Sequence, residues 1–278
     1  NLEFDQKYHS SVTSTTYRHW RLHNGKFATL QYFSADGSDR TVSTINDWSL
    51  KVYNEQALEE YVNNRTYPEH KDNYAVVVAG SSGWSNYRHQ ADALAMYHAL
   101  KAQGFDDDHI ILIMEDDIAY NHKNKHSGEM KIVSDGENLY KDVMIDYKMS
   151  TLYPADIHNI MTGEKSARTP IVLESSKNDN VFVFWSGHGE YKALIYNERE
   201  FNASEVRSML ETMNANKKYR KLFFVMETCF SGSVAEACEG INGILMMTAA
   251  NDSETSKADM FDSELGVYLS NGFTRAFQ

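Results

Sequence analysis

Short apolar runs alternate with segments of helical periodicity from residue 73 to the C-terminus. Five runs are almost continuously apolar: YAVVVAG (74–80), IILIM (110–114), VFVFW (181–185), LFFVM (222–226) and GILMMTA (243–249). Strands of a parallel sheet have this composition, because helices on both sides bury both faces of the sheet. The pattern therefore predicts an α/β fold with a mostly parallel central sheet that is covered by helices on both faces.

Two of the intervening segments have the signature of helices. In 93–100 the apolar residues recur at i, i+3, i+4 and i+7, and Gly104 follows as a helix terminator. The second helix is expected to begin at Asn202, which forms a capping-box-like pair with Glu205, and to run to about Met213.

Two other stretches do not follow this alternation. Residues 115–153 are polar and too long for an ordinary connection, so we expect an excursion over the surface. In the N-terminal part, HWRLHNGKFATLQYF predicts two short strands around the NG turn at 24–25, and a helix is expected over about 54–62. We therefore expect a small β-rich extension of unknown role at 1–70 and a main domain at 71–278.

Composition narrows the classes of partner. The chain is 42% hydrophobic and 24% charged, with a net charge of -12, which opposes nucleic-acid binding because that needs a basic face. No apolar run reaches the roughly 18 residues of a membrane span, and no signal peptide opens the chain. Because the chain begins at Asn1 rather than Met, removal of a leader or pro-segment is compatible with the sequence, and the compartment is not readable from it. We expect neither a cofactor nor a metal.

Polar residues suited to chemistry collect directly after three of the apolar runs. They are Asn86, Arg88 and His89 after the first run, His188 after the third, and Glu227 and Cys229 after the fourth. The carboxyl ends of parallel strands lie at one edge of the sheet, and ligands bind near that edge. The sequence therefore predicts a single site at this edge.

Cys229 by itself has two interpretations. A lone cysteine after a strand is more often a buried structural residue, and a disulfide with Cys238 is conceivable, although a chain of this size does not need one. However, Cys229 lies outside the apolar run, and His188 stands between Gly187 and Gly189, which leave its ring open to a ligand. An imidazole that removes the thiol proton makes cysteine a nucleophile. Both interpretations, a structural cysteine and a Cys–His catalytic pair, stay open at this point.

Three long motifs surround these strand ends: WSNYRHQADALAMYHALKAQGFDDDHIILIMEDDIAYN, VFVFWSGHGE and FFVMETCFSGS. With them, the chain resembles the legumain (asparaginyl endopeptidase) family of cysteine peptidases over about residues 73–278. That family also includes the catalytic subunit of the GPI transamidase. The resemblance implies a caspase-like α/β sandwich. It further implies that Cys229 is the nucleophile and His188 the general base and acid, that Asn86 orients His188, and that the backbone N–H groups of Gly189 and Cys229 form an oxyanion hole.

The resemblance also implies a specificity pocket for an Asn side chain. The arginine of this pocket is matched by Arg88, and its two acids by Glu227 and Asp262. The match of Asp262 depends on an ungapped alignment from Ala249. His89 is a further residue that lines the pocket. An amide has one acceptor oxygen and an NH₂ donor group, so it needs a donor opposite an acceptor. An Asp substrate would meet like charges, and acid pH should therefore broaden the specificity. A purely structural Arg88–Glu227 ion pair is the alternative.

The function that the resemblance implies is cleavage of peptide bonds after Asn, and after Asp at acid pH, through a thioester acyl-enzyme. A transamidase that passes the acyl group to an amine, a non-catalytic peptide-binding protein and a redox role for Cys229 are the alternatives. Gly187 stands where animal and plant legumains carry an Asp, so ligase behaviour is not implied. The expected partner is a peptide or protein, in an extracytoplasmic compartment (secreted, periplasmic or lumenal), and the oligomeric state is not readable.

Overall fold

The chain forms two compact units, residues 1–68 and 69–278, in a computed structural model that describes residues 71–277 and five strands before them. The N-terminal strands are β1 (Leu2–Phe4), β2 (His9–Ser10), β3 (Thr15–Leu22), β4 (Phe27–Ser34) and β5 (Ile45–Val52). They form an antiparallel sheet of order β1-β3-β4-β5, with β2 paired to β3. The predicted strands at the NG turn are β3 and β4. The turn itself and the helix expected at 54–62 lie outside the described residues.

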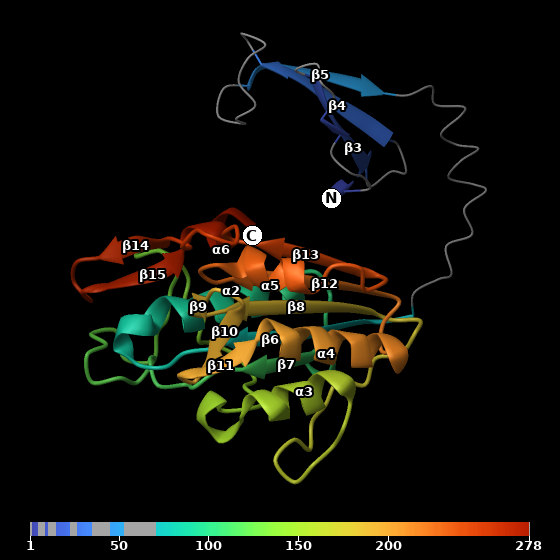
Figure 1. The fold of residues 1–278 in the computed structure, drawn as a ribbon. Coiled ribbons are helices and arrows are strands. Elements are labelled where there is room, and N and C mark those ends of the chain that lie inside the picture. Colours follow the sequence, from blue (N-terminus) through green and yellow to red (C-terminus); the bar gives the residue numbers. More distant parts are fainter. Residues whose placement is uncertain are drawn as a thin grey trace. The chain divides into compact units, whose positions relative to one another are not determined.

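The second unit is built on a five-stranded sheet in which every pair of neighbours is parallel (Figure 1). Its strands are β6 (Asn73–Ala79), β7 (Ile110–Ile113), β8 (Asn180–Ser186), β12 (Lys221–Glu227) and β13 (Ile244–Thr248). Their order is β13-β12-β8-β6-β7. All five predicted runs are strands of this sheet, as the sequence predicts.

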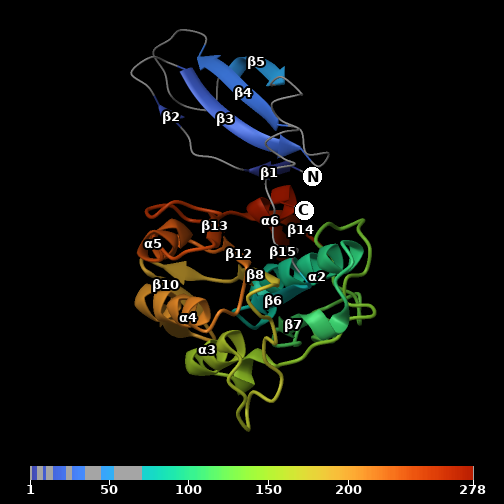
Figure 2. The same ribbon diagram turned by 90° about the vertical axis from the view of Figure 1, so that its right-hand side faces the viewer.

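Helices cover both faces of the sheet (Figures 1 and 2). The helices are α2 (Tyr87–Ala102), α3 (Pro154–Thr162), α4 (Ala203–Ala215), α5 (Ser231–Ala237) and α6 (Gly272–Phe277). Short 3₁₀ turns add η2 (Trp84–Asn86), η3 (Asp107–His109) and η4 (Met149–Thr151). The α4 capping box is present, with the Asn202 N–H donating to Glu205 over 2.8 Å. The predicted α/β sandwich, which is consistent with a caspase-like fold, is confirmed.

The alternation of strand side chains produces one core on each side of the sheet. Val76 and Val78 pack with the buried residues of α3, α4 and α5, whereas Val77 packs with those of α2. In β12, Leu222 belongs to the first of these cores and Val225 to the second. Both faces of the central strands are thus removed from water, which explains why these strands are apolar without interruption.

Two small antiparallel sheets extend the edge at which the central strands end. The first contains β9 (Gly189–Glu190), β10 (Ala193–Tyr196) and β11 (Arg199–Asn202), in the order β11-β10-β9. The second is the hairpin of β14 (Ala258–Asp262) and β15 (Val267–Asn271). They follow β8 and β13 in the chain, so they surround the carboxyl edge of the sheet.

Two features of this unit differ from the sequence-based expectations. β13 is an edge strand and not fully buried, since Leu245 is 49% exposed. The segment 115–148 is irregular as expected, but it does not merely cross the surface, because Ile118 and Met130 are fully buried in the α2 core. The Nδ2 group of Asn124 donates to three carbonyl groups of this segment, which satisfies polar groups that no sheet or helix could pair.

Among the described residues, no helix combines the length and the apolar character that crossing a membrane requires.

The two faces of the sheet give a matched test of the core. Leu222 is 1% exposed, and its Leu222→Ala variant should lose about 3 kcal/mol of the free energy of unfolding, because a cavity remains. Leu245→Ala, the same change on the exposed side of the neighbouring strand, should cost less than about 1 kcal/mol. Urea unfolding of both variants measures the difference, and equal losses would contradict the assignment of the edge strand.

Candidate active site

The three central strands end level with one another. Ala79 of β6 pairs in register with Ser186 of β8, and Ser186 pairs with Glu227 of β12. The chain leaves β6 for β7 on one side and returns to β8 on the other, so β6 and β8 flank the topological switch point of the sheet. Open α/β sheets bind their ligands at this point, outside the carboxyl ends of the strands.

Asn86 and His188 meet across the switch point. The Nε2 atom of His188 lies 2.8 Å from the Oδ1 atom of Asn86, and the Nδ2 group of Asn86 donates to the Ser82 carbonyl over 2.8 Å. Since the Asn86 amide nitrogen is occupied by Ser82, its oxygen faces the ring, and an oxygen of this kind only accepts. His188 therefore carries its hydrogen on Nε2 in the neutral state, which leaves Nδ1 as the proton acceptor.

His188 is surrounded by groups that oppose its positive charge. Partial burial of the ring and the nearby Arg88 guanidinium lower the pKa of His188 below its ordinary value. The rings of His89 and His188 pack edge to face, with their centroids 4.8 Å apart. The Nδ1 atom of His89 lies 2.5 Å from Ser81 Oγ. His89 is 2% exposed, and burial, then Arg88 and His188, hold its pKa well below the ordinary value. His188 is thus neutral near pH 7 and able to take a proton.

Cys229 lies at the end of β12, against the chain that carries His188. A Cβ atom on Gly189 would overlap the carbonyl oxygen of Cys229 and come within 2.9 Å of the Thr228 side chain. Only glycine allows this approach of the two backbones. Cys229 is half-buried, and its Sγ atom lies 3.7 Å from Ser256 Oγ.

The two thiols have different environments. Both cysteines are free, so the conceivable disulfide between them does not form in this structure. Cys238 is 4% exposed, and burial raises the pKa of its thiol to about 11. Because the thiolate is the reactive form, Cys238 is inert and Cys229 is the thiol available for chemistry.

The pairing of β9 with β10 determines the direction of the Gly189 N–H. His188 and Ile195 are a hydrogen-bonded pair, with the Ile195 N–H donating to the His188 carbonyl over 3.0 Å. The next pair, Gly189 with Leu194, is consequently a non-hydrogen-bonded one. The Gly189 N–H therefore points away from β10 and is not used in the pairing of these two strands.

Glu227 and Arg88 lie close enough to influence each other's pKa, and Arg88 also lies near Cys229. Glu227 is fully buried, and its Oε2 atom accepts from the Thr274 N–H at 2.8 Å and from Thr274 Oγ1 at 2.9 Å, while its Oε1 atom has no partner among the described residues. Burial raises the pKa of Glu227 to about 7, against the opposing effects of Thr274 and Arg88. Burial lowers the pKa of Arg88, which the charges of Asp92, Cys229 and Glu227 counteract.

The described hydrogen bonds of Arg88 and Glu227 do not join the two side chains to each other. The Arg88 Nη1 group donates to the Ser85 carbonyl over 2.9 Å, whereas Glu227 is held by Thr274. Within residues 71–277, their described hydrogen bonds thus go to different groups. Both side chains keep capacity to bind a ligand, unlike the members of a purely structural ion pair.

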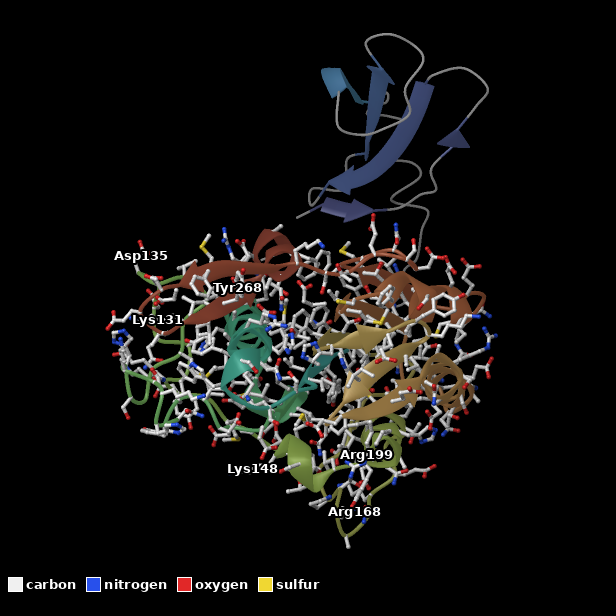
Figure 3. The ribbon with its side chains drawn as sticks, turned by 60° about the vertical axis from the view of Figure 1, so that its left-hand side comes forward. Lys131, Asp135, Lys148, Arg168, Arg199 and Tyr268 are labelled. Carbon is white, nitrogen blue, oxygen red and sulfur yellow. The ribbon has the colours of Figure 1, made fainter. Side chains whose placement is uncertain are left out.

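The structure places Asp262 on the β14–β15 hairpin, away from these groups. Its carboxylate accepts from Ser134 Oγ at 2.8 Å and from the N–H groups of Glu264 and Leu265, and these hydrogen bonds lower its pKa. Figure 3 shows this hairpin, labelled at Tyr268, with Lys131 and Asp135 of the irregular segment next to it. The structure therefore brings together Asn86, Arg88, His89, His188, Gly189, Glu227 and Cys229, and ties Asp262 to the irregular segment.

Two polar residues of this region were missed by the sequence analysis. Asp92 is fully buried on α2, one turn after Arg88, and Ser256 faces the thiol of Cys229. A signal for Asp92 was present, because it is an acidic residue between Ala91 and Ala93, at the start of the apolar part of the helix. No signal pointed to Ser256, which comes from a polar loop.

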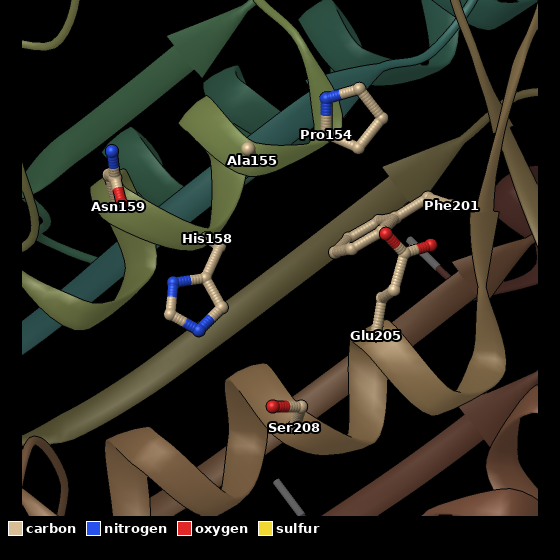
Figure 4. A pocket seen from close by; sticks show the side chains of 7 residues that line it. All are labelled: Pro154, Ala155, His158, Asn159, Phe201, Glu205 and Ser208. Atoms are coloured by element: carbon tan, nitrogen blue, oxygen red, sulfur yellow. The ribbon is translucent and has the colours of Figure 1, made fainter.

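One hollow of this unit lies between α3 and α4 (Figure 4). It has a volume of about 280 Å³ and contains none of the predicted site residues. Its Glu205 carboxylate already accepts the Asn202 N–H at the start of α4, so we assign no chemistry to it. Within the described part of the chain, no group of three or more His, Cys, Asp or Glu residues is arranged to hold a metal ion.

Comparison with known proteins identifies relatives of this chain. Residues 73–278 match the model of the Peptidase C13 family. The chain is 33% identical to "Legumain" of Mus musculus over 72% of this chain and 47% of that protein. It is 38% identical to "Hemoglobinase" of Schistosoma japonicum over 73% of this chain and 48% of that protein. For the "Vacuolar-processing enzyme delta-isozyme" of Arabidopsis thaliana the identity is 37%, over 66% and 40%.

The chain spans about half the length of the mouse legumain and the schistosome hemoglobinase. The matched region begins at the first strand of the central sheet and contains every residue gathered at its carboxyl edge. The family model covers well over half of the chain, and the relatives confirm the resemblance found in the three motifs. The chain therefore belongs to the peptidase C13 family, the family of the legumains.

Proposed function

We propose that this protein is a cysteine endopeptidase that cleaves peptide bonds after Asn, and after Asp at acid pH, through a thioester acyl-enzyme. The observation that carries the proposal is the hydrogen bond from His188 Nε2 to Asn86. Gly189, the residue after His188, comes close to the backbone of Cys229. This arrangement leaves the other ring nitrogen of His188 available for the thiol proton.

The chemistry follows from these positions. Cys229 attacks the carbonyl carbon of the peptide bond as His188 takes its proton, and the N–H groups of Gly189 and Cys229 stabilise the oxyanion that forms. His188 then returns the proton to the leaving amine, which departs as the C–N bond breaks and the thioester remains. A water molecule, activated by His188, attacks the thioester, releases the carboxylic acid and restores the thiol. Asn86 keeps the ring in the productive orientation.

The residues behind Cys229 suit an Asn side chain. Arg88 donates to the amide oxygen, and the unpaired Oε1 atom of Glu227 accepts from the amide NH₂. A buried acceptor without a partner is rare in folded proteins and is suited to a ligand that supplies the missing hydrogen. His89 packs edge-on against His188 and is included in the proposed site. Asp262 is not included, because its carboxylate already accepts from Ser134, Glu264 and Leu265.

The names of two relatives, hemoglobinase and vacuolar-processing enzyme, describe a protein substrate and a compartment of those proteins. They support a peptide or protein substrate and an extracytoplasmic location for this chain.

The first test is a set of fluorogenic peptides that differ only in the residue before the scissile bond, assayed under reducing conditions from pH 5 to 8. We expect turnover of the Asn peptide by the wild type and a loss of at least about 10³-fold in Cys229→Ala, because the nucleophile is gone. The absence of turnover for every peptide would refute the peptidase proposal. A preference for Arg or Lys would refute the pocket alone, and amide formation with an added amine, measured by mass spectrometry, would instead indicate a transamidase.

The two glycines beside His188 provide a matched pair of variants. Gly189→Ala should reduce kcat/KM at least about 10²-fold, since its Cβ meets the Cys229 carbonyl and would displace an oxyanion donor. Gly187→Ala should stay within a few-fold of the wild type, because the nearest atom to its Cβ would be at an ordinary 3.5 Å. Kinetics on the Asn peptide measure both, and similar losses in the two variants would contradict the close approach at Gly189.

The pKa of Glu227 predicts how specificity changes with pH. Below about pH 7 Glu227 gains a proton and no longer repels an Asp carboxylate, whereas above this pH it is ionised and does. The ratio of kcat/KM for Asp over Asn peptides should therefore rise as the pH falls through about 7. A ratio is measured so that the titration of His188 cancels.

Glu227→Gln provides the control for this pH dependence. It keeps an acceptor for Thr274 but does not titrate, so the ratio should lose its step near pH 7. A step that persists in the variant would show that another group controls the discrimination.

A further inference from the structure

Asp92 is a fully buried carboxyl group that the proposed chemistry does not use. Its Oδ2 atom accepts from Ser186 Oγ at 3.0 Å and from Asn271 Nδ2 at 2.6 Å, and its Oδ1 atom accepts from the Asn271 N–H at 3.1 Å. Ser186 and Asn271 are themselves buried, so no water competes for these groups. Removing one partner of such a buried network leaves the others unsatisfied.

The neighbours of Asp92 lie on the same helices and strands as the residues of the site. Arg88 lies one helical turn earlier on α2. Burial lowers the pKa of Arg88, and Asp92 is the strongest of the charges that oppose this effect. Ser186 ends β8, two residues before His188. Asn271 ends β15 and leads directly into α6, where Thr274 holds Glu227. One carboxyl group thus connects α2, β8 and the β15–α6 corner.

The number of donors explains why the residue is an acid. Three hydrogens converge on two oxygens, one from a hydroxyl group, one from a backbone amide and one from a side-chain amide. The two oxygens of a carboxyl group can accept all three of these hydrogens. Burial, and then the charge of Glu227, raise the pKa of Asp92 well above its ordinary value, and the hydrogen bonds from Asn271 and Ser186 oppose this rise.

We propose that Asp92 is the positioning residue of the specificity pocket: by binding Ser186 and Asn271 beside Arg88, it fixes the pocket's arginine relative to His188 and Glu227. Asp92 acts through its neighbours and not on the substrate, because both of its oxygens already accept hydrogen bonds from Ser186 and Asn271. The inference rests on the proposed cleavage after Asn and deepens it, since it names a second acid behind the pocket.

The test compares Asp92→Asn with a buried carboxylate elsewhere on the sheet. Asp179 is 4% exposed and accepts from Ser176 Oγ at 2.7 Å, the Ser176 N–H at 2.7 Å and the Asp72 N–H at 3.0 Å, but it lies just before β8, at the opposite edge from the site. Asp179→Asn therefore removes a similar buried carboxyl group without reaching the pocket. Three quantities are measured: the thermal midpoint, the ratio of kcat/KM for Asn over Ala peptides, and the rate at which iodoacetamide alkylates Cys229.

We expect both variants to unfold at lower temperature, because each buried network loses a carboxyl group that accepts three hydrogen bonds. Only Asp92→Asn should lower the ratio for Asn over Ala, by about ten-fold or more, because Arg88 is no longer held opposite Glu227. The alkylation rate of Cys229 should stay within about two-fold in both. The double variant D92N/N271D exchanges the carboxyl group and the amide between positions 92 and 271, so that the hydrogen bond between them can form again. It should restore most of the wild-type ratio of kcat/KM for Asn over Ala peptides.

Three outcomes would overturn the inference. If Asp92→Asn and Asp179→Asn change the ratio equally, the role of Asp92 is only structural. If the wild type is alkylated but does not prefer Asn, the proposed function fails, and the inference about Asp92 fails with it. If the wild type prefers Asn and Asp92→Asn retains that preference, the inference alone fails.

A second variant covers the case in which Asp92→Asn does not fold. Ser186→Ala removes one of the three donors, and it should lower the same ratio by a smaller factor with the alkylation rate unchanged. An unchanged ratio in Ser186→Ala would also overturn the inference.

Discussion

The parallel register of β6, β8 and β12 is the constraint on which the site depends. Because Ala79, Ser186 and Glu227 stand in one row, the residues after them leave the sheet at the same height. A shift of this register by one residue would turn each strand's side chains to the other face and place the loops at different levels. The large apolar area buried on both faces of the sheet therefore fixes the position of the polar loops that follow the strands.

Much of this arrangement could be predicted from the sequence, because the relevant signals are local. Continuous apolar runs mark the central strands, and polar residues directly after them mark the carboxyl edge. The hydrogen bond between Asn86 and His188 joins residues far apart in the chain, but both are close to a strand end, so the topology alone predicts their proximity.

The features that could not be predicted depend on contacts without a local pattern. Asp92 finds Asn271 across 179 positions of the sequence, and no spacing rule connects a helix residue with the end of a distant hairpin strand. The burial of Ile118 and Met130 in an irregular segment has the same origin, because their burial depends on the space beside α2 and not on periodicity. Likewise, the composition of β13 resembles that of a central strand, and only the strand order reveals that it lies at the edge.

Glu227 and Cys229 lie only two residues apart at the end of β12, and the proposed function gives them different roles. β12 ends at Glu227, which is fully buried, and the chain turns directly after it, so that Cys229 is partly accessible. The end of one strand thus carries both residues to the same edge of the sheet. In the proposed cleavage, Glu227 binds the substrate side chain and Cys229 attacks the carbonyl group that follows it. Their short separation along the chain would then couple recognition of the side chain to attack on the neighbouring peptide bond.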